Sequence, residues 1–229
     1  MINGANAKRL NGLDTSQGVL DIIEQFYENG WTDGFPIVPP TEALVTAMLE
    51  ASSRDPLEVL GIVPPRNGIA TVESVAINAV MSGCKPEYMP VVLAAVEALL
   101  DERFDVHGLQ ATSDPAAPMV VVSGPIVEEI GINHGPSLFG PGSRANATIG
   151  RTLRLILINL GGGYPDSGDK STLGSPSKYS YCIGVDVDTP WSPLHTEFGF
   201  DEKDSCVMVY AADAPRGNNP GGSGSMEFT

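Results

Sequence analysis

The stretch "GPGSRANATIGRTLRL", residues 140–155, joins a Gly-Pro-Gly turn directly to a long helical pattern. At 100° per residue, Arg144, Thr148 and Arg151 fall on one side of such a helix, and leucine and isoleucine continue that side. The opposite side is apolar throughout. The spacing therefore predicts a buried helix over residues 143–160, with cations in its first half, which is not the pattern of a solvated surface helix.

Working outward from this helix, the clearest strand is "PMVVVSG" at residues 118–124, a β-branched run bounded by proline and glycine. Strands and helices follow one another without a regular βαβ rhythm. We therefore predict an α/β (or α+β) fold, a compact layered mixed sheet with packed helices. Further strands are expected at 59–65, 179–187 and 205–212, and helices at 15–29 (capped by Thr15 or Ser16), from Thr41, and at 71–82, 88–101 and 125–131.

Residues 1–215 are predicted to form a single α/β domain, and 216–229, rich in Gly, Asn, Pro and Ser, a flexible tail or linker. An alternative division has two small α/β subdomains that meet near residues 103–117. Three cysteines without a CxxC pair indicate neither a disulfide framework nor a zinc ribbon.

The composition limits the partners. Lysine and arginine number 13 and the acids 28, for a net charge of −15, which argues against nucleic acid and anionic membranes as partners. The first residues lack the apolar core of a signal peptide, and the longest apolar stretch, 89–100, is too short to span a bilayer. A soluble, cytoplasmic protein is expected.

The arginines of the central helix suggest a binding site. Buried guanidinium groups need carboxylate, phosphate or carbonyl partners, and a helix N-terminus adds free N–H groups. One interpretation is a pocket for a small anion, with Arg144, Asn146 and Arg151 as donors. The alternative is internal ion pairing, with Glu73 or Asp33 as the carboxylate, because so acidic a chain offers many partners.

Several other residues are candidates for chemistry. Glu73 falls in the first turn of the predicted 71–82 helix. Cys84 follows the end of that helix, which would raise its pKa, but the start of the next helix would favour its thiolate. A buried, inert thiol is the alternative. His107 and His195 fall in loops, and no metal-binding spacing such as HExxH occurs, so a metal site would need ligands from scattered loops.

Six motifs together resemble an uncharacterised family of prokaryotic proteins, over residues 30–212: "GWTDGFPIVPPT", "ATVESVAINAVMSGCKPEYMPVV", "HGLQAT", "GPGSRANATIGRTLRL", "GDKSTLGSPSKYSYC" and "PWSPLH". The resemblance implies work with a small partner protein that carries a selenocysteine or cysteine motif, and hence thiol- or redox-linked chemistry. Related chains continue beyond the position of Pro215, which implies either a truncated chain or one subunit of a split protein. In the second case, a partner subunit completes the C-terminal part. The resemblance covers Trp31, Asp33, Glu73, Asn78, Cys84, Glu87, His107, Gln110, Arg144, Asn146, Arg151, Asp169, Lys178 and His195.

The main hypothesis is a subunit, or the main part, of a heteromeric enzyme that acts on a small anionic or carbonyl-bearing substrate; whether it uses a cofactor is unknown from the sequence. A non-catalytic binding subunit whose acidic surface docks a partner, and a metalloprotein, are the alternatives. In the enzyme hypothesis, Glu73 or Asp33 is the general base, His107 or His195 the general acid or metal ligand, and Cys84 a nucleophile or ligand. Substrate binding falls to Arg144, Asn146, Arg151, Trp31 and Lys178.

Overall fold

Two small sheets organise the part of the chain that the computed structural model describes, residues 18–215. In the larger sheet, β3 (Ala117–Ser123) lies between β4 (Cys182–Gly184), which is parallel to it, and β5 (Cys206–Ala212), which is antiparallel. The smaller sheet is an antiparallel pair of β1 (Val59–Val63) and β2 (Gly68–Thr71). The mixed sheet and its helices confirm the predicted α/β or α+β class.

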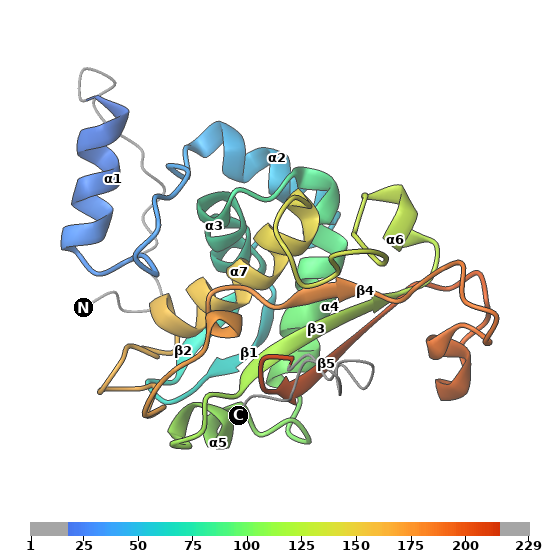
Figure 1. Cartoon of the computed structure of the whole chain (residues 1–229). Coiled ribbons are helices and arrows are strands. Elements are labelled where there is room, and N and C mark those ends of the chain that lie inside the picture. The colour runs from blue at the N-terminus through green and yellow to red at the C-terminus, as the bar shows by residue number, and fades with distance from the viewer. Residues whose placement is uncertain (1–17, 216–229) are drawn as a thin grey trace, which may run out of the picture.

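The helices form layers against the larger sheet (Figure 1). α4 packs on β5 and β3, and α7 on β4 and β3, while α3 packs on α7 and α2 on α3. Within residues 18–215, no helix is long and apolar enough to cross a membrane. The helices are α1 (Val19–Glu28), α2 (Glu42–Ser52), α3 (Val72–Ser82), α4 (Met89–Leu100), α5 (Val106–Ala111), α6 (Ile126–Glu129) and α7 (Arg144–Asn159), with 3₁₀ turns η1 (Pro86–Tyr88), η2 (Pro176–Lys178) and η3 (Leu194–Phe198).

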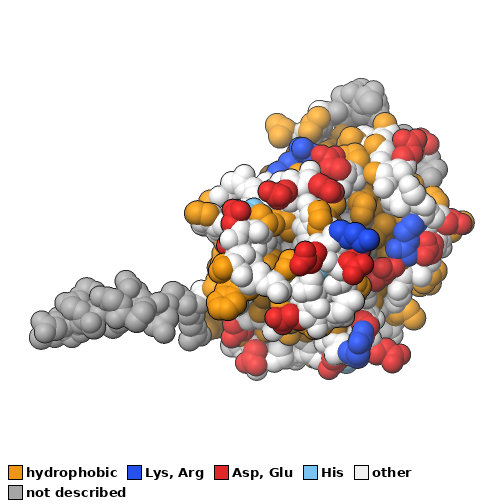
Figure 2. Space-filling view, turned by 90° about the vertical axis from the view of Figure 1, so that its right-hand side faces the viewer, with side chains coloured by type: hydrophobic (Ala, Val, Ile, Leu, Met, Phe, Trp, Pro, Cys, Tyr) orange, Lys and Arg blue, Asp and Glu red, His pale blue; other side chains and the backbone are white. Residues whose placement is uncertain are grey.

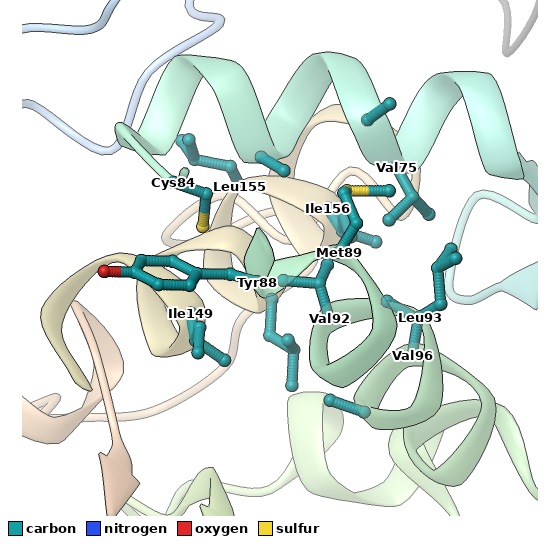
Figure 3. Packing of buried hydrophobic residues seen from close by; sticks show 14 of the residues in the cluster. Val75, Cys84, Tyr88, Met89, Val92, Leu93, Val96, Ile149, Leu155 and Ile156 are labelled. Atoms are coloured by element: carbon teal, nitrogen blue, oxygen red, sulfur yellow. The ribbon is translucent and has the colours of Figure 1, made fainter. Parts of the chain in front are cut away.

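α7 is the helix predicted from the opening stretch, and it lies in the middle of the core. Ile149, Leu153 and Ile156 are at most 1% exposed, and burial of a side chain of this size stabilises the fold by about 1.5–3 kcal/mol. Figure 3 shows Ile156 beside Val75 of α3 and Met89 of α4, and Ile149 near Tyr88. Gly150 lets the chain approach closely, since a Cβ there would lie 2.4 Å from the backbone nitrogen of Tyr181.

Local capping explains why several helices begin and end where the sequence predicts. Thr41 caps α2 by accepting from the Leu44 N–H, and Thr71 and Ser74 form a capping box at the start of α3. Gly83 ends α3 with a φ of +92°, a conformation that glycine adopts without strain.

Other expectations differ from the structure. The strand predicted over 179–187 is limited to Cys182–Gly184, and β2 was not predicted. In α1 the apolar stripe is narrower than expected, because Val19 is 62% exposed while Ile22 and Phe26 are buried. Thr15, Ser16 and the predicted tail 216–229 lie outside the described residues.

Candidate functional site

A pocket of about 490 Å³ lies beside the second half of α7. One wall is the segment after α7, residues 163–179, and another comes from Thr32 and Asp33 in the loop after α1. The lining combines apolar side chains, including Ile158 and Leu173, with four charged ones. The charged lining residues are Asp33, Arg154, Asp169 and Lys178.

Arg154 enters this pocket from α7 and is 8% exposed. Its Nε donates to the carbonyl oxygen of Lys178 at 2.6 Å, and its Nη1 donates to Oδ2 of Asp169 at 3.3 Å. Burial lowers the pKa of this guanidinium, and the charge of Asp169 opposes that shift. Lys178 donates from Nζ to both carboxylate oxygens of Asp169, at 3.1 and 2.9 Å. One buried carboxylate therefore pairs with a buried arginine and with a lysine whose side chain is 13% exposed.

Arg151 lies one helical turn earlier and forms a second ion pair. Its Nε and Nη2 donate to the two carboxylate oxygens of Asp33 at 2.7 and 2.8 Å, and Nη2 also donates to the Pro36 carbonyl at 2.9 Å. The Asp33 side chain is 2% exposed. Arg151 is thus a positioning residue for the 30–36 loop. The alternative interpretation, internal pairing with Asp33, describes it correctly, and the pairing occupies the donors that the ligand interpretation assigned to a guest.

Two more side chains hold the 30–36 loop against α7 and the segment after it. Asn159, at the end of α7, donates to the Trp31 carbonyl at 3.2 Å, and the Tyr164 hydroxyl donates to the Gly30 carbonyl at 2.5 Å. Burial raises the pKa of the Tyr164 phenol, and Arg66, stacked over its ring, opposes this. The loop is a fixed wall of the pocket.

The segment after α7 folds tightly enough to bury its own charges. The N–H groups of Gly168 and Asp169 both donate to the Tyr164 carbonyl, at 3.0 and 2.9 Å. The Ser171 N–H donates to Oδ1 of Asp169 at 3.1 Å, which adds a third partner to that carboxylate. Ser175 then caps η2, which carries Lys178. These local bonds turn the carboxylate and the ammonium toward α7.

The charges of this cluster do not cancel. Three cations, Arg151, Arg154 and Lys178, face two carboxylates, Asp33 and Asp169, so the cluster carries a net charge of +1. Nη2 of Arg154 makes no hydrogen bond to any residue in 18–215. Nor is this atom among the fully buried, unpartnered polar atoms of that range. Among residues 18–215, Nη2 is therefore a charged donor without a protein partner, on a residue that lines the pocket.

The structure does not bring Arg144 and Asn146 to this pocket. Arg144 is exposed, and its Nε donates to the Gly83 carbonyl at 2.9 Å. The Asn146 side chain accepts from the Asn133 N–H at 2.7 Å and donates to the Asn133 carbonyl at 3.0 Å. Asn146 borders a separate pocket of about 350 Å³ at the start of α7. The three predicted anion donors therefore do not form one site. Backbone groups bind the side chains of Arg144 and Asn146, and Arg151 pairs with Asp33.

The structure buries Cys84 in the core, where a thiolate is disfavoured. Its side chain is 6% exposed, and Sγ lies 3.3 Å from Oγ1 of Thr152 and 3.5 Å from Oγ of Ser82. Burial raises the pKa of the thiol, and the hydroxyl contacts and Arg144 offset part of that shift. Figure 3 shows the sulfur pointing into the core near Tyr88 and Leu155. The burial agrees with the alternative interpretation, a thiol held in the core.

His195 is 1% exposed and fastens two segments together. Its Nε2 lies 3.1 Å from the Asp201 carbonyl, which can only accept, so Nε2 carries the proton. Nδ1 lies 2.8 Å from the Ser123 hydroxyl. With both nitrogens occupied and no solvent access, this histidine is not placed to act as a general acid.

The remaining predicted site residues lie elsewhere. His107 is exposed on α5, and Glu73 is half-buried in the first turn of α3. Trp31 packs edge-on against Phe26, with ring centroids 5.2 Å apart. Within residues 18–215, no group of three or more His, Cys, Asp or Glu side chains is arranged to hold a metal ion.

Comparisons with protein-family models, with curated proteins and with solved structures gave no match to this chain. The site is therefore defined by its own geometry. Among the predicted residues, Asp33 and Lys178 line the pocket and Arg151 supports it. Sequence reasoning did not assign roles to Arg154 and Asp169. One feature of the sequence could have indicated Arg154. It lies in the apolar half of α7 and has no acidic residue one helical turn away, so its ion-pair partner must come from another segment.

Proposed function

We propose that this protein binds a small organic monoanion in the pocket beside α7, as the binding step of an enzyme that acts on it. The observation that carries the proposal is the open Nη2 donor of buried Arg154, within a cluster of net charge +1. A carboxylate guest matches a guanidinium in both shape and charge. A charge-assisted hydrogen bond of this kind contributes about 1.5–3 kcal/mol to binding.

The walls of the pocket limit the rest of the guest. Ile158, Leu173 and Tyr179 supply apolar contacts, and a volume of about 490 Å³ is in the range used by small-molecule sites. A compact molecule with one carboxylate and an apolar or carbonyl-bearing body fits this lining. A di- or trianion does not, because Asp33 and Asp169 would repel the additional charge.

The same residues indicate which steps the protein would assist. Arg154 would stabilise negative charge that develops on a carbonyl or carboxylate oxygen of the guest. Tyr164, whose pKa is raised by burial, would remain a protonated phenol at neutral pH and so would not act as a base. Its single O–H donates to the Gly30 carbonyl, so it holds the pocket wall and is not a donor to the guest. Thiol chemistry is not included, because Cys84 lies in the core and away from the residues that line this pocket.

Calorimetric titration with benzoate tests the proposal, with benzamide as the neutral molecule of the same shape. We expect benzoate to bind with a Kd on the order of 1 mM and benzamide to bind about tenfold more weakly. Lys178→Gln, which removes the excess positive charge, should weaken benzoate to the same extent. Arg103→Gln, at a side chain that is 91% exposed, is the matched control and should leave binding unchanged. Equal affinity for benzoate and benzamide would refute the proposal.

A further inference from the structure

Residues 185–205 connect β4 to β5 and project from the end of the larger sheet. Figure 1 shows this segment, with η3, at the opposite side of the molecule from the 163–179 segment that walls the pocket. We call residues 185–205 the acidic arm. The arm contributes no residue to the lining of the proposed anion site.

The arm exposes large aromatic side chains. Trp191 is 79% exposed, Phe198 61% and Phe200 49%. Large apolar groups gathered on one projecting segment are unusual on a surface with no partner, and aromatic residues are enriched where proteins bind each other. The arm therefore has the side-chain chemistry of a contact surface.

The arm is also strongly negative. It carries six carboxylates, Asp186, Asp188, Glu197, Asp201, Glu202 and Asp204, against one cation, Lys203. The Lys203 ammonium lies 4.0 Å from the Asp201 carboxylate, and both side chains are largely exposed. Figure 2, which views this side of the molecule, shows acidic and apolar side chains interspersed, with few basic ones.

Fixed bonds hold the base of the arm on the fold. Buried His195 bonds to Ser123 of β3 and to the Asp201 carbonyl, as described above. At the far end of the arm, Oγ of Ser205 accepts from the Ile126 N–H of α6 at 3.1 Å. The aromatic and acidic groups are therefore presented on a preorganised loop, which reduces the entropy lost on binding.

We infer that the acidic arm docks a polypeptide partner with a basic surface. Arginine or lysine side chains of such a partner would pair with the carboxylates and stack on Trp191 and the two phenylalanines. A second copy of this chain is disfavoured, because the whole chain carries a net charge of −15 and two arms would repel each other. Nucleic acids and anionic membranes carry the same sign of charge and are disfavoured for the same reason.

The test uses a fluorescein-labelled nona-arginine peptide and fluorescence anisotropy at low salt. The arm variant is Asp188→Asn/Glu197→Gln/Glu202→Gln. The matched control removes three exposed acids from α1 and α2, as Glu24→Gln/Glu42→Gln/Glu50→Gln. Each variant loses three negative charges, so the two proteins have the same net charge and differ only in the position of the acids that were removed. Trp191→Ser tests the aromatic contribution separately.

We expect the arm variant to weaken peptide binding at least fivefold and Trp191→Ser to weaken it about threefold, while the control stays within twofold of the unmodified chain. Equal losses in the arm and control variants would overturn the inference, as would no binding of the peptide to the unmodified chain. Sedimentation of the protein alone provides a second check. A dimer that Trp191→Ser dissociates would show that the occupant is another copy of the chain.

Discussion

Replacing Asp169 by asparagine should have opposite effects on stability and on anion binding. The variant keeps the size of the side chain but removes the charge that Arg154 and Lys178 share. Their side chains are 10% and 13% exposed, and loss of one partner of a buried ion pair costs about 3–5 kcal/mol. Because the amide oxygen can still accept one hydrogen bond, we expect a loss near 3 kcal/mol in the free energy of unfolding, a large part of a typical total of about 5–15 kcal/mol.

The same substitution raises the net charge of the cluster from +1 to +2 (three cations against Asp33 alone). Benzoate should therefore bind the folded variant more tightly, by about tenfold. Since a ligand that binds the folded state stabilises it, benzoate should restore part of the lost stability.

Urea unfolding, followed by circular dichroism with and without benzoate, measures both effects. Asp101→Asn is the control, because Asp101 pairs with Arg103 at the surface and makes no contact with the pocket. Its unfolding should stay close to that of the unmodified protein and should respond to benzoate in the same way. If Asp169→Asn unfolds like Asp101→Asn, or if benzoate stabilises it less than the unmodified protein, the assigned charge cluster is wrong.

Three other perturbations test separate parts of the structure. Arg151→Met should release the 30–36 loop and weaken benzoate binding several-fold, and hydrogen exchange of the loop amides should increase; unchanged exchange would contradict the positioning role. Because burial raises the pKa of the Cys84 thiol, its contribution to stability is complete below the unfolded-state pKa of about 8.5 and is lost as pH rises further. Cys84→Ala should therefore show a smaller loss of stability than the unmodified protein between pH 8 and 10, as measured by thermal unfolding. His195→Ala should leave the Ser123 hydroxyl without its partner, lower stability by about 1–3 kcal/mol and expose residues 185–205 to limited proteolysis; a cleavage pattern identical to that of the unmodified protein would argue against the fastening role.

Much of the helical framework follows from local sequence signals. The 3.6-residue periodicity of α7, the threonine caps of α2 and α3, and the glycine after α3 all lie within a few residues of what they determine. β3 is recognisable because a run of β-branched residues flanked by proline and glycine favours a buried strand over a helix or a loop. The pairing of β4 and β5 with β3 was not predictable in the same way, because it depends on segments that are distant in the sequence.

The site was harder to predict for a related reason. The helical periodicity distinguishes two sides of α7, and Arg154 lies between them. The pattern of either side therefore did not predict a role for Arg154. Its partners are 15 and 24 residues away, in a segment whose path depends on tight turns. The sequence did indicate that cations on this helix need buried partners. It did not indicate that Asp33 would occupy Arg151 and leave an open donor on Arg154.

The most direct test of the account is calorimetric titration of benzoate into the unmodified protein and into Arg154→Gln at neutral pH. We expect one benzoate to bind per chain with saturation, and we expect Arg154→Gln to lose that binding while its circular dichroism spectrum shows that it is folded. Benzoate that binds Arg154→Gln as tightly as the unmodified protein, or no benzoate binding to the unmodified protein, would contradict it.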